Sequence, residues 1–166
     1  MSTLNIPSKF KLDIDNNNHS LKQIIIIADP TTNNILYTLT TDNEHLYNSE
    51  NNEKLDTIKA LDRVSSVRVS SDFDSKKLKI NRLRCTFYNY YNVKNKLSDI
   101  INQNVVNKDI YLFYKSPTTN KIEIPFTGED DYSCAMLYRG IVSRVKVDDK
   151  IINITAEDKT QVKFAD

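Results

Sequence analysis

Residues Leu137 to Asp158 read LYRGIVSRVKVDDKIINITAED, and this stretch decides the fold class. Two runs rich in β-branched residues flank the polar turn Asp148-Asp149-Lys150. In the second run Ile152, Ile154 and Ala156 alternate with polar side chains. Alternation of this kind on both sides of a short polar turn predicts a β-hairpin with one face in a core.

Alternation along the first run of the hairpin predicts which residues share each face of the strand. One face carries Ile141, Ser143, Val145 and Val147, and the other carries Tyr138, Val142, Arg144 and Lys146. Gly140 lies inside this run, and a glycine within a strand indicates a bulge or a close approach by another backbone segment. Asp158 ends the final strand, where its carboxylate either caps the following turn or faces water.

The rest of the chain shows the same β pattern. An isoleucine-rich run and its successor flank the turn cluster at residues 29–34 and predict a second hairpin. The strand from Ile110 is apolar on both parities, which predicts a central strand buried on both faces. Pro125 restricts the last short run to an edge or a bulge. The expected strands are Leu21–Ala28, Ile35–Thr41, Val64–Ser70, Leu78–Tyr90, Ile110–Lys115 and Ile122–Phe126, with Leu55–Leu61 fitting either a helix or, as we interpret it, extended chain.

Three further features complete the predicted fold. The apolar parity of the Leu78–Tyr90 run switches near Asn81-Arg82, which predicts a β-bulge or a bend. Residues 94–106 have helical spacing and predict the one short helix. Residues 1–20 are polar and predict an arm with a short strand at Phe10–Ile14. The predicted fold is therefore mainly β, a small antiparallel β-barrel or sandwich with one short helix, organised as an N-terminal arm (1–20) and a barrel-like domain (21–166).

Composition limits the class of protein. A chain of 166 residues suits one domain. The formal net charge of +1 argues against a protein that coats nucleic acid, although it leaves room for a local basic patch. Cys85 and Cys134 stand in apolar surroundings and predict buried free thiols, with a disulfide left open. The N-terminus lacks the pattern of a secretory signal, and the longest aliphatic run, Ile24–Ala28, is too short to span a membrane, so we expect a soluble protein.

Candidate groups for chemistry are few. The acidic clusters Glu129-Asp130-Asp131 and Asp148-Asp149 could serve acid–base catalysis or bind a cation, but neighbouring acids in turns usually face water. His19 and His45 lie in polar loops without metal-ligand spacing. Only two glycines are present, so no glycine-rich phosphate loop can form. We therefore expect a protein that is not an enzyme, with no catalytic, cofactor-binding or metal-binding residues.

The segment from Arg82 to Tyr91 mixes cations with aromatic residues. Exposed aromatic side chains beside cations can stack bases in barrel-type nucleic-acid-binding proteins. The favoured interpretation is that Phe87 belongs to the core and that the tyrosines pack at a strand end or at a subunit contact. The alternative function is a small β-barrel module that binds single-stranded nucleic acid or a glycan through Arg84, Tyr88, Tyr90 and Tyr91.

An ordered series of short segments covers about residues 20 to 164. The segments are Val64-Ser65-Ser66-Val67, Asp72-Phe73-Asp74, Lys76–Ile80, Asn89-Tyr90, Leu97-Ser98-Asp99, Ile110–Lys115, Leu137–Val142 and Ala156–Gln161. In this order the series resembles the N-terminal region of tail or baseplate-hub proteins of marine bacteriophages.

The resemblance implies a structural protein of the virion tail, made in the host cytoplasm. Hub-like proteins of this kind build β-barrel domains that assemble as rings, often trimers, and join the tail tube to a spike or baseplate. The resemblance therefore implies a homo-oligomer with other tail proteins as partners, and neither nucleic acid nor a membrane span is expected. Family members generally continue beyond the segment that matches Glu157 to Gln161, whereas this sequence ends at Asp166.

Overall fold

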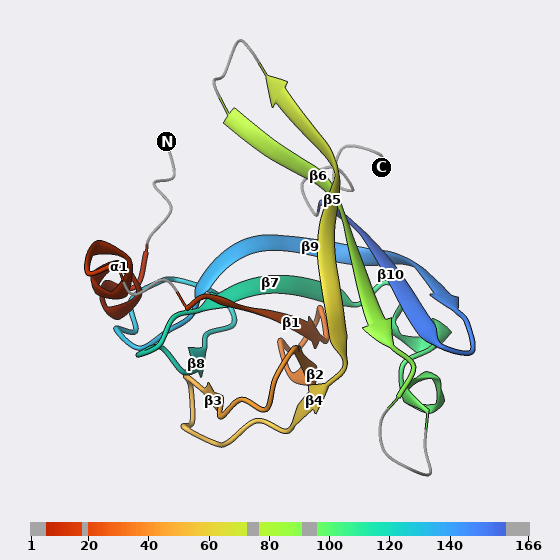
Figure 1. Ribbon diagram of the computed structural model, residues 1–166, viewed down its shortest axis with the longest axis horizontal. Coiled ribbons are helices and arrows are strands. Elements are labelled where there is room, and N and C mark those ends of the chain that lie inside the picture. Colours follow the sequence, from red (N-terminus) through yellow and green to blue (C-terminus); the bar gives the residue numbers. More distant parts are fainter. Residues whose placement is uncertain (1–5, 18–19, 73–76, 91–95, 159–166) are drawn as a thin grey trace.

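The computed structural model describes residues 6–17, 20–72, 77–90 and 96–158, and within this part the side chains of 66–81 are not described. The fold is mainly β, with 48% strand and 11% helix (Figure 1). Its elements are α1 (Ser8–Asp15), β1 (Lys22–Ala28), β2 (Ile35–Thr40), β3 (Tyr47–Asn48), β4 (Thr57–Lys59), β5 (Leu61–Asp72), β6 (Lys77–Tyr88), the 3-10 turns η1 (Leu97–Asp99) and η2 (Gln103–Val105), β7 (Asp109–Lys115), β8 (Lys121–Ile122), β9 (Ala135–Val147) and β10 (Ile151–Asp158).

Eight strands form one sheet in the order β4-β2-β1-β7-β9-β10-β6-β5, and β3 pairs with β8 in a second, two-stranded sheet. The large sheet is antiparallel except for the parallel pair β2–β4. In Figure 1, β5 and β6 run steeply across the direction of β7 and β9, so the sheet is strongly bent.

The two edge strands of the large sheet meet at a single residue. Only Ala60 separates β4 from β5 along the chain. Its N–H donates to the Thr40 carbonyl (3.1 Å), and its carbonyl accepts from the N–H of Tyr88 (2.8 Å). The sheet curls until its ends touch at this residue, but it is not a closed barrel. A sandwich-like β fold with one helix describes it, as the hydrophobic pattern predicted.

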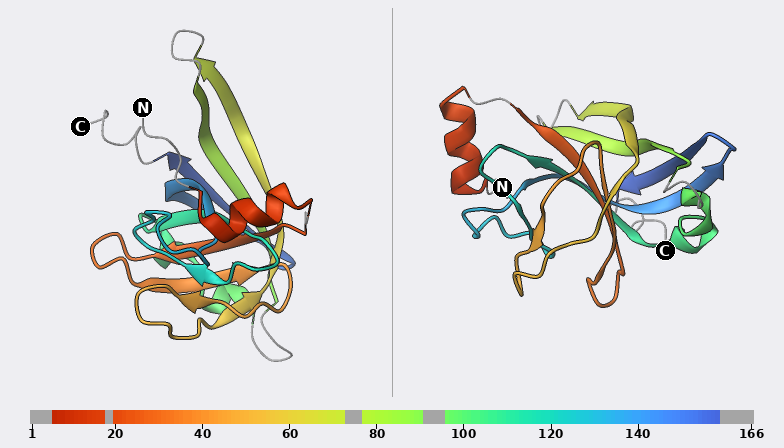
Figure 2. Two further views of the ribbon diagram at one scale, coloured as in Figure 1. Left: turned by 90° about the vertical axis from the view of Figure 1, so that its left-hand side faces the viewer. Right: turned by 60° about the horizontal axis from the view of Figure 1, so that its bottom comes forward.

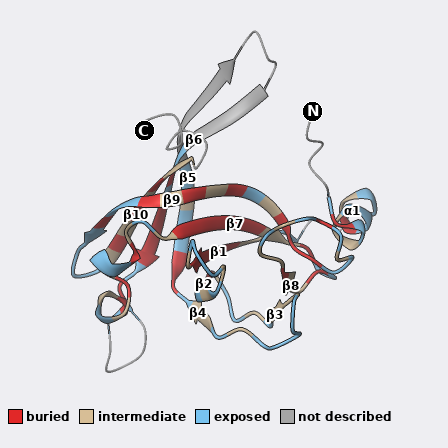
Figure 3. Cartoon of the chain, turned by 180° about the vertical axis from the view of Figure 1, so that it is seen from behind, coloured by how far each residue is buried: buried red, intermediate tan, exposed pale blue. Residues whose placement is uncertain are grey.

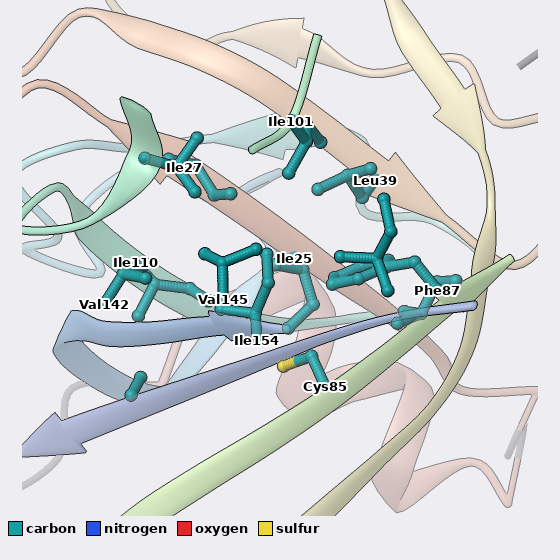
Figure 4. Packing of buried hydrophobic residues seen from close by; sticks show 14 of the residues in the cluster. Ile25, Ile27, Leu39, Cys85, Phe87, Ile101, Ile110, Val142, Val145 and Ile154 are labelled. Atoms are coloured by element: carbon teal, nitrogen blue, oxygen red, sulfur yellow. The ribbon is translucent and has the colours of Figure 1, made fainter. Parts of the chain in front are cut away.

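The main core lies inside the curled sheet, and Figure 4 shows its side chains converging from opposite walls. Strand β1 contributes Ile25 and Ile27 from one wall, and β6 and β10 contribute Cys85, Phe87 and Ile154 from the other. All five are fully buried. Their parity is the one that the sequence predicted for β6 and β10.

A second core covers the other face of β1 and β7. Because side chains alternate along a strand, Ile24 and Ile26 of β1 pack there with Tyr111 and Phe113 of β7. Ile122 of β8 belongs to the same cluster. In Figure 3, β1 and β7 are buried along most of their length, which confirms the prediction of a central strand buried on both sides.

The predicted faces of β9 are only partly right. Val145 is buried as expected, but Val142 is fully buried and Val147 is 43% exposed. The register explains the burial of Val142, because Thr155 pairs with Arg144 whereas Ala156 pairs with Val142. Ser143 is therefore an extra residue in β9, and the bulge turns Tyr138, Gly140 and Val142 inward.

Two other irregularities match the sequence. Arg68 pairs with Arg82 and Val69 with Ile80, so the predicted bulge at Asn81-Arg82 is confirmed in the backbone register. Gly140 is the predicted site of close approach. A Cβ atom there would lie 2.5 Å from the Glu157 carbonyl oxygen and 2.5 Å from the Tyr138 hydroxyl.

The predicted helix at residues 94–106 is wrong. Within its described residues, 96–106, the chain forms η1 and η2, and Asn102 breaks the helical path with φ −142° and ψ −149°. The Asn102 side chain accepts the N–H of Asn104, a local bond that competes with helix formation. Leu97, Ile101 and Val105 are nevertheless buried in the main core.

The expected strand at Phe10–Ile14 is also wrong, because Ser8–Asp15 forms α1. Contacts that are distant in sequence hold this helix. The buried Asp13 carboxylate accepts the Thr118 hydroxyl (2.6 Å) and N–H (3.0 Å). In the right-hand view of Figure 2, α1 lies at the edge of the molecule, and in the left-hand view it lies in front of the strands.

Candidate functional site

A groove of about 570 Å³ lies on the outer surface of β5, β6, β10 and β9, on the side of the sheet away from the main core. Its position follows from strand alternation. Residues 83, 85 and 87 of β6 point inward, so the intervening residues point outward. The lining residues are Arg63, Ser65, Arg84, Thr86, Arg144, Lys146, Ile151, Asn153 and Thr155.

The register places these residues in two rows across the sheet. In the first row, Thr155 of β10 pairs with Arg84 on one side and Arg144 on the other. In the second row, Asn153 pairs with Thr86 and Lys146, and Arg63 pairs with Thr86. Each row therefore carries two cations, separated by Thr155 in the first row and by Thr86 and Asn153 in the second.

One hydrogen bond joins the two uncharged polar side chains in the middle of the second row. The Thr86 hydroxyl donates to the Asn153 side-chain oxygen (2.8 Å). Thr86 and Asn153 both line the groove, so its floor carries uncharged polar groups between the cations.

Carboxylates are scarce around these cations. Among the described residues, none forms an ion pair with Arg84, Arg144 or Lys146. Arg63 has only a long contact with its neighbour Asp62, at 3.9 Å. The lining of the groove therefore carries a local excess of positive charge although the whole chain is nearly neutral, and beside it on the same face Glu157 of β10 pairs with Arg82 (3.1 Å).

Tyr88 stands at one end of the same face. It lies two residues beyond Thr86 on β6, and its side chain is 51% exposed. Its hydroxyl donates to Asp62 (2.8 Å), and this bond, together with the Asp62 charge, raises the pKa of Tyr88. The ring is thus tethered at the rim of the groove.

The structure brings together only part of the aromatic–basic set that the sequence singled out. Arg84 and Tyr88 share the outer face of β6, and Phe87 is buried as predicted. Tyr90 is exposed but lies beyond the end of β6, and Tyr91 lies outside the described residues.

Sequence reasoning missed Arg63, Arg144 and Lys146 as neighbours of Arg84. Each strand had shown alternating polar positions, but nothing in one strand's sequence says which residues of another strand stand beside it. The available signal was that the outward positions next to Arg84 on the partner strands carry Arg144 and Lys146.

The two acidic clusters form no shared site. Asp130 accepts the Ser49 hydroxyl (2.6 Å) and lies 3.4 Å from the Lys121 ammonium. Burial alone would raise the pKa of Asp130, but these partners and the N–H of Tyr132 hold it below its usual value. Asp131 accepts the Ser8 hydroxyl of α1 (2.7 Å), so this loop anchors neighbouring segments.

The second acidic cluster belongs to the β9–β10 turn. The Asp149 carboxylate pairs with Lys96, which lowers its pKa through the hydrogen bond and the lysine charge. The Asp148 carbonyl accepts the side-chain amide of Asn89 (2.9 Å). Asp149 therefore joins the turn to the start of η1, and Asp148 joins it to the end of β6.

The remaining candidates fit ordinary roles. His45 is exposed, and His19 lies outside the described residues. Cys85 and Cys134 are buried and free, as predicted, and burial raises the pKa of each thiol to about 12. Within the part of the chain that is described, no group of three His, Cys, Asp or Glu side chains could hold a metal ion.

No protein-family model matches this chain, and a search of curated proteins found no match. Among the described elements, no helix has both the length and the apolar character needed to cross a membrane.

Proposed function

We propose that this protein is a structural component of a bacteriophage tail, a baseplate-hub-like β domain that holds copies of itself and neighbouring tail proteins in place. One observation carries the proposal. The segments that resemble tail-hub proteins, far apart in sequence, pair with one another in the framework of the curled sheet.

Strand β9 is the centre of this framework. Its segment Leu137–Val142 lies between two other segments of the resemblance. Towards β7, Tyr138 pairs with Leu112 and Gly140 with Ile110. Towards β10, Gly140 pairs with Asp158 and Val142 with Ala156. Phe73-Asp74, Lys76 and residues 159–161 of the series lie outside the described residues.

Asn89 links two further segments of the series. Its side chain is 8% exposed, and its amide oxygen accepts the N–H of Ser98 (2.9 Å) while its nitrogen donates to Asp148 (2.9 Å). The end of β6, η1 and the β9–β10 turn therefore meet at one buried amide. The resembling residues therefore form part of the scaffold of this chain, which is what a load-transmitting structural protein requires.

Contacts with neighbours need exposed amphipathic surface. Tyrosine is enriched in protein interfaces because its ring is large and its hydroxyl tolerates water. Tyr90 is 58% exposed at the end of β6, in the position where the sequence suggested a subunit contact. Self-association through this end, as a trimer by the resemblance, is part of the proposal.

Light scattering of the purified chain over a range of concentrations tests the self-association. We expect a species heavier than the 19.2 kDa chain, at three copies if the trimer holds. Tyr90→Ser should weaken the assembly, whereas Tyr132→Ser, which removes a tyrosine that is 46% exposed elsewhere, should not. A 19.2 kDa species at every concentration would contradict self-association.

A further inference from the structure

We propose that the outer face of β5, β6, β10 and β9 binds the phosphate backbone of single-stranded nucleic acid in the cationic groove. This inference rests on the groove and on Tyr88 at its rim, and is independent of the proposed tail function. It revises the expectation of no nucleic acid and takes up the alternative function considered from the sequence.

The charge distribution is the first argument. The chain has 23 Lys and Arg against 22 Asp and Glu, yet the groove lining holds four cations and no carboxylate. Clustered like charges repel one another, so a folded protein gains nothing from this arrangement by itself. An anionic ligand would relieve the repulsion, and a neutral glycan would not.

The spacing of the cations favours a chain over a compact anion. Arg144 and Lys146 are two residues apart on β9, about 6.6 Å along the strand. Arg84 and Arg144 lie on either side of β10, which separates them by about 9.6 Å. The charges are spread over a four-stranded face, so a linear polyanion can reach all of them whereas one phosphate ion cannot.

The side-chain types favour nucleic acid over an acidic peptide. Three of the four cations are arginines, whose planar guanidinium binds phosphate through two parallel hydrogen bonds and also stacks on bases. Tyr88 is 51% exposed at the rim of this face, where a base can stack on it. An open sheet surface suits a single strand, because the duplex grooves are read by protruding helices or ribbons.

Fluorescence anisotropy with a labelled oligothymidylate of about 12 nucleotides tests the proposal on the full chain. With four phosphate contacts, the affinity should fall about 50-fold between 50 and 200 mM salt. In Arg84→Gln/Arg144→Gln, two contacts remain, so binding should be weaker and the same change in salt should lower it only about 7-fold.

A matched control removes the same charge elsewhere. Lys11 and Lys54 are exposed and do not line the groove. Lys11→Gln/Lys54→Gln should therefore keep the affinity and the salt dependence of the unchanged protein. Circular dichroism checks each fold; if the arginine double variant unfolds, the single variants Arg63→Gln and Lys146→Gln take its place.

Three results would overturn the proposal. The first is no binding to the oligonucleotide at 50 mM salt. The second is equal loss of affinity in the groove and control variants, which would mean non-specific attraction. The third is equal or tighter binding of polyglutamate, which would assign the groove to an acidic protein segment instead.

Discussion

Replacing Gly140 tests the packing of the curled sheet most sharply. This residue lies on β9 between Ile110 of β7 and Asp158 of β10. A Cβ atom at this position would meet the Glu157 carbonyl oxygen at 2.5 Å, and the Tyr138 hydroxyl and ring at 2.5 and 2.8 Å. These separations are too short for non-bonded heavy atoms, so Gly140→Ala and Gly140→Val both force a rearrangement.

Two responses set the magnitude. If β10 shifts to make room, overpacking costs about 1–3 kcal/mol. If instead the Tyr138 ring leaves the core, where it is 5% exposed, the lost burial of 150–250 Å² costs about 4–6 kcal/mol as an upper bound. The shift of β10 costs less than the loss of Tyr138 burial, so the structure adopts the shift. We therefore expect a destabilisation of about 1–3 kcal/mol, larger for valine than for alanine.

Thermal unfolding followed by circular dichroism measures the effect. For a chain of this size, a loss of 1–3 kcal/mol lowers Tm by about 2–12 °C. Leu137→Val is the control, because Leu137 lies on the same strand but is 47% exposed, and its change should stay within about 0.5 kcal/mol. Unchanged melting temperatures for both Gly140 variants would refute the reasoning.

The Tyr138 hydroxyl is buried and has no hydrogen-bond partner among the described residues, so Tyr138→Phe should stabilise the protein by about 1 kcal/mol in urea unfolding. A loss of stability would reveal a partner for the hydroxyl. Asp29 accepts the N–H groups of Thr31 and Thr32 and the Lys108 ammonium, which lower its pKa to about 2. Its unfolded-state pKa is about 3.9, so its contribution is present above that pH and is lost as the pH falls towards 2. Asp29→Asn should therefore make unfolding less dependent on pH in this range, and an unchanged pH profile would argue against these bonds.

The sequence predicted those parts of the fold that depend on one strand at a time. The two-sided burial of β7, the inward face of β10 and the free thiols of Cys85 and Cys134 all follow from local apolar patterns. The bulge in β6 was also visible, because the apolar parity of its own residues switches.

The predictions are wrong where a contact with another residue or strand determines the local structure. Ser143 forms a bulge in its pairing with β10. The residues of β9 that precede Ser143 therefore point to the opposite face from the one that simple alternation predicts. The helix α1 is held by Thr118 and Asp131, more than 100 residues away in sequence. Asn102 captures the N–H of Asn104 and ends the helical path that the apolar spacing suggested.

Dependence on a partner strand also explains why the sequence revealed only part of the candidate site. Arg84 was noticed because aromatic residues follow it in sequence. Its relation to Arg144 depends on the register of β6, β10 and β9, which pairs both arginines with Thr155. A groove built across strands therefore could not be read from any one of them.

The most direct test of the proposed function is an image of a phage particle whose genome encodes this chain, at a resolution that traces strands. The proposal predicts density for the curled eight-stranded sheet in the tail or baseplate, repeated around the tail axis. A particle whose tail is fully assigned to other proteins, with this chain only in the infected cell, would contradict it.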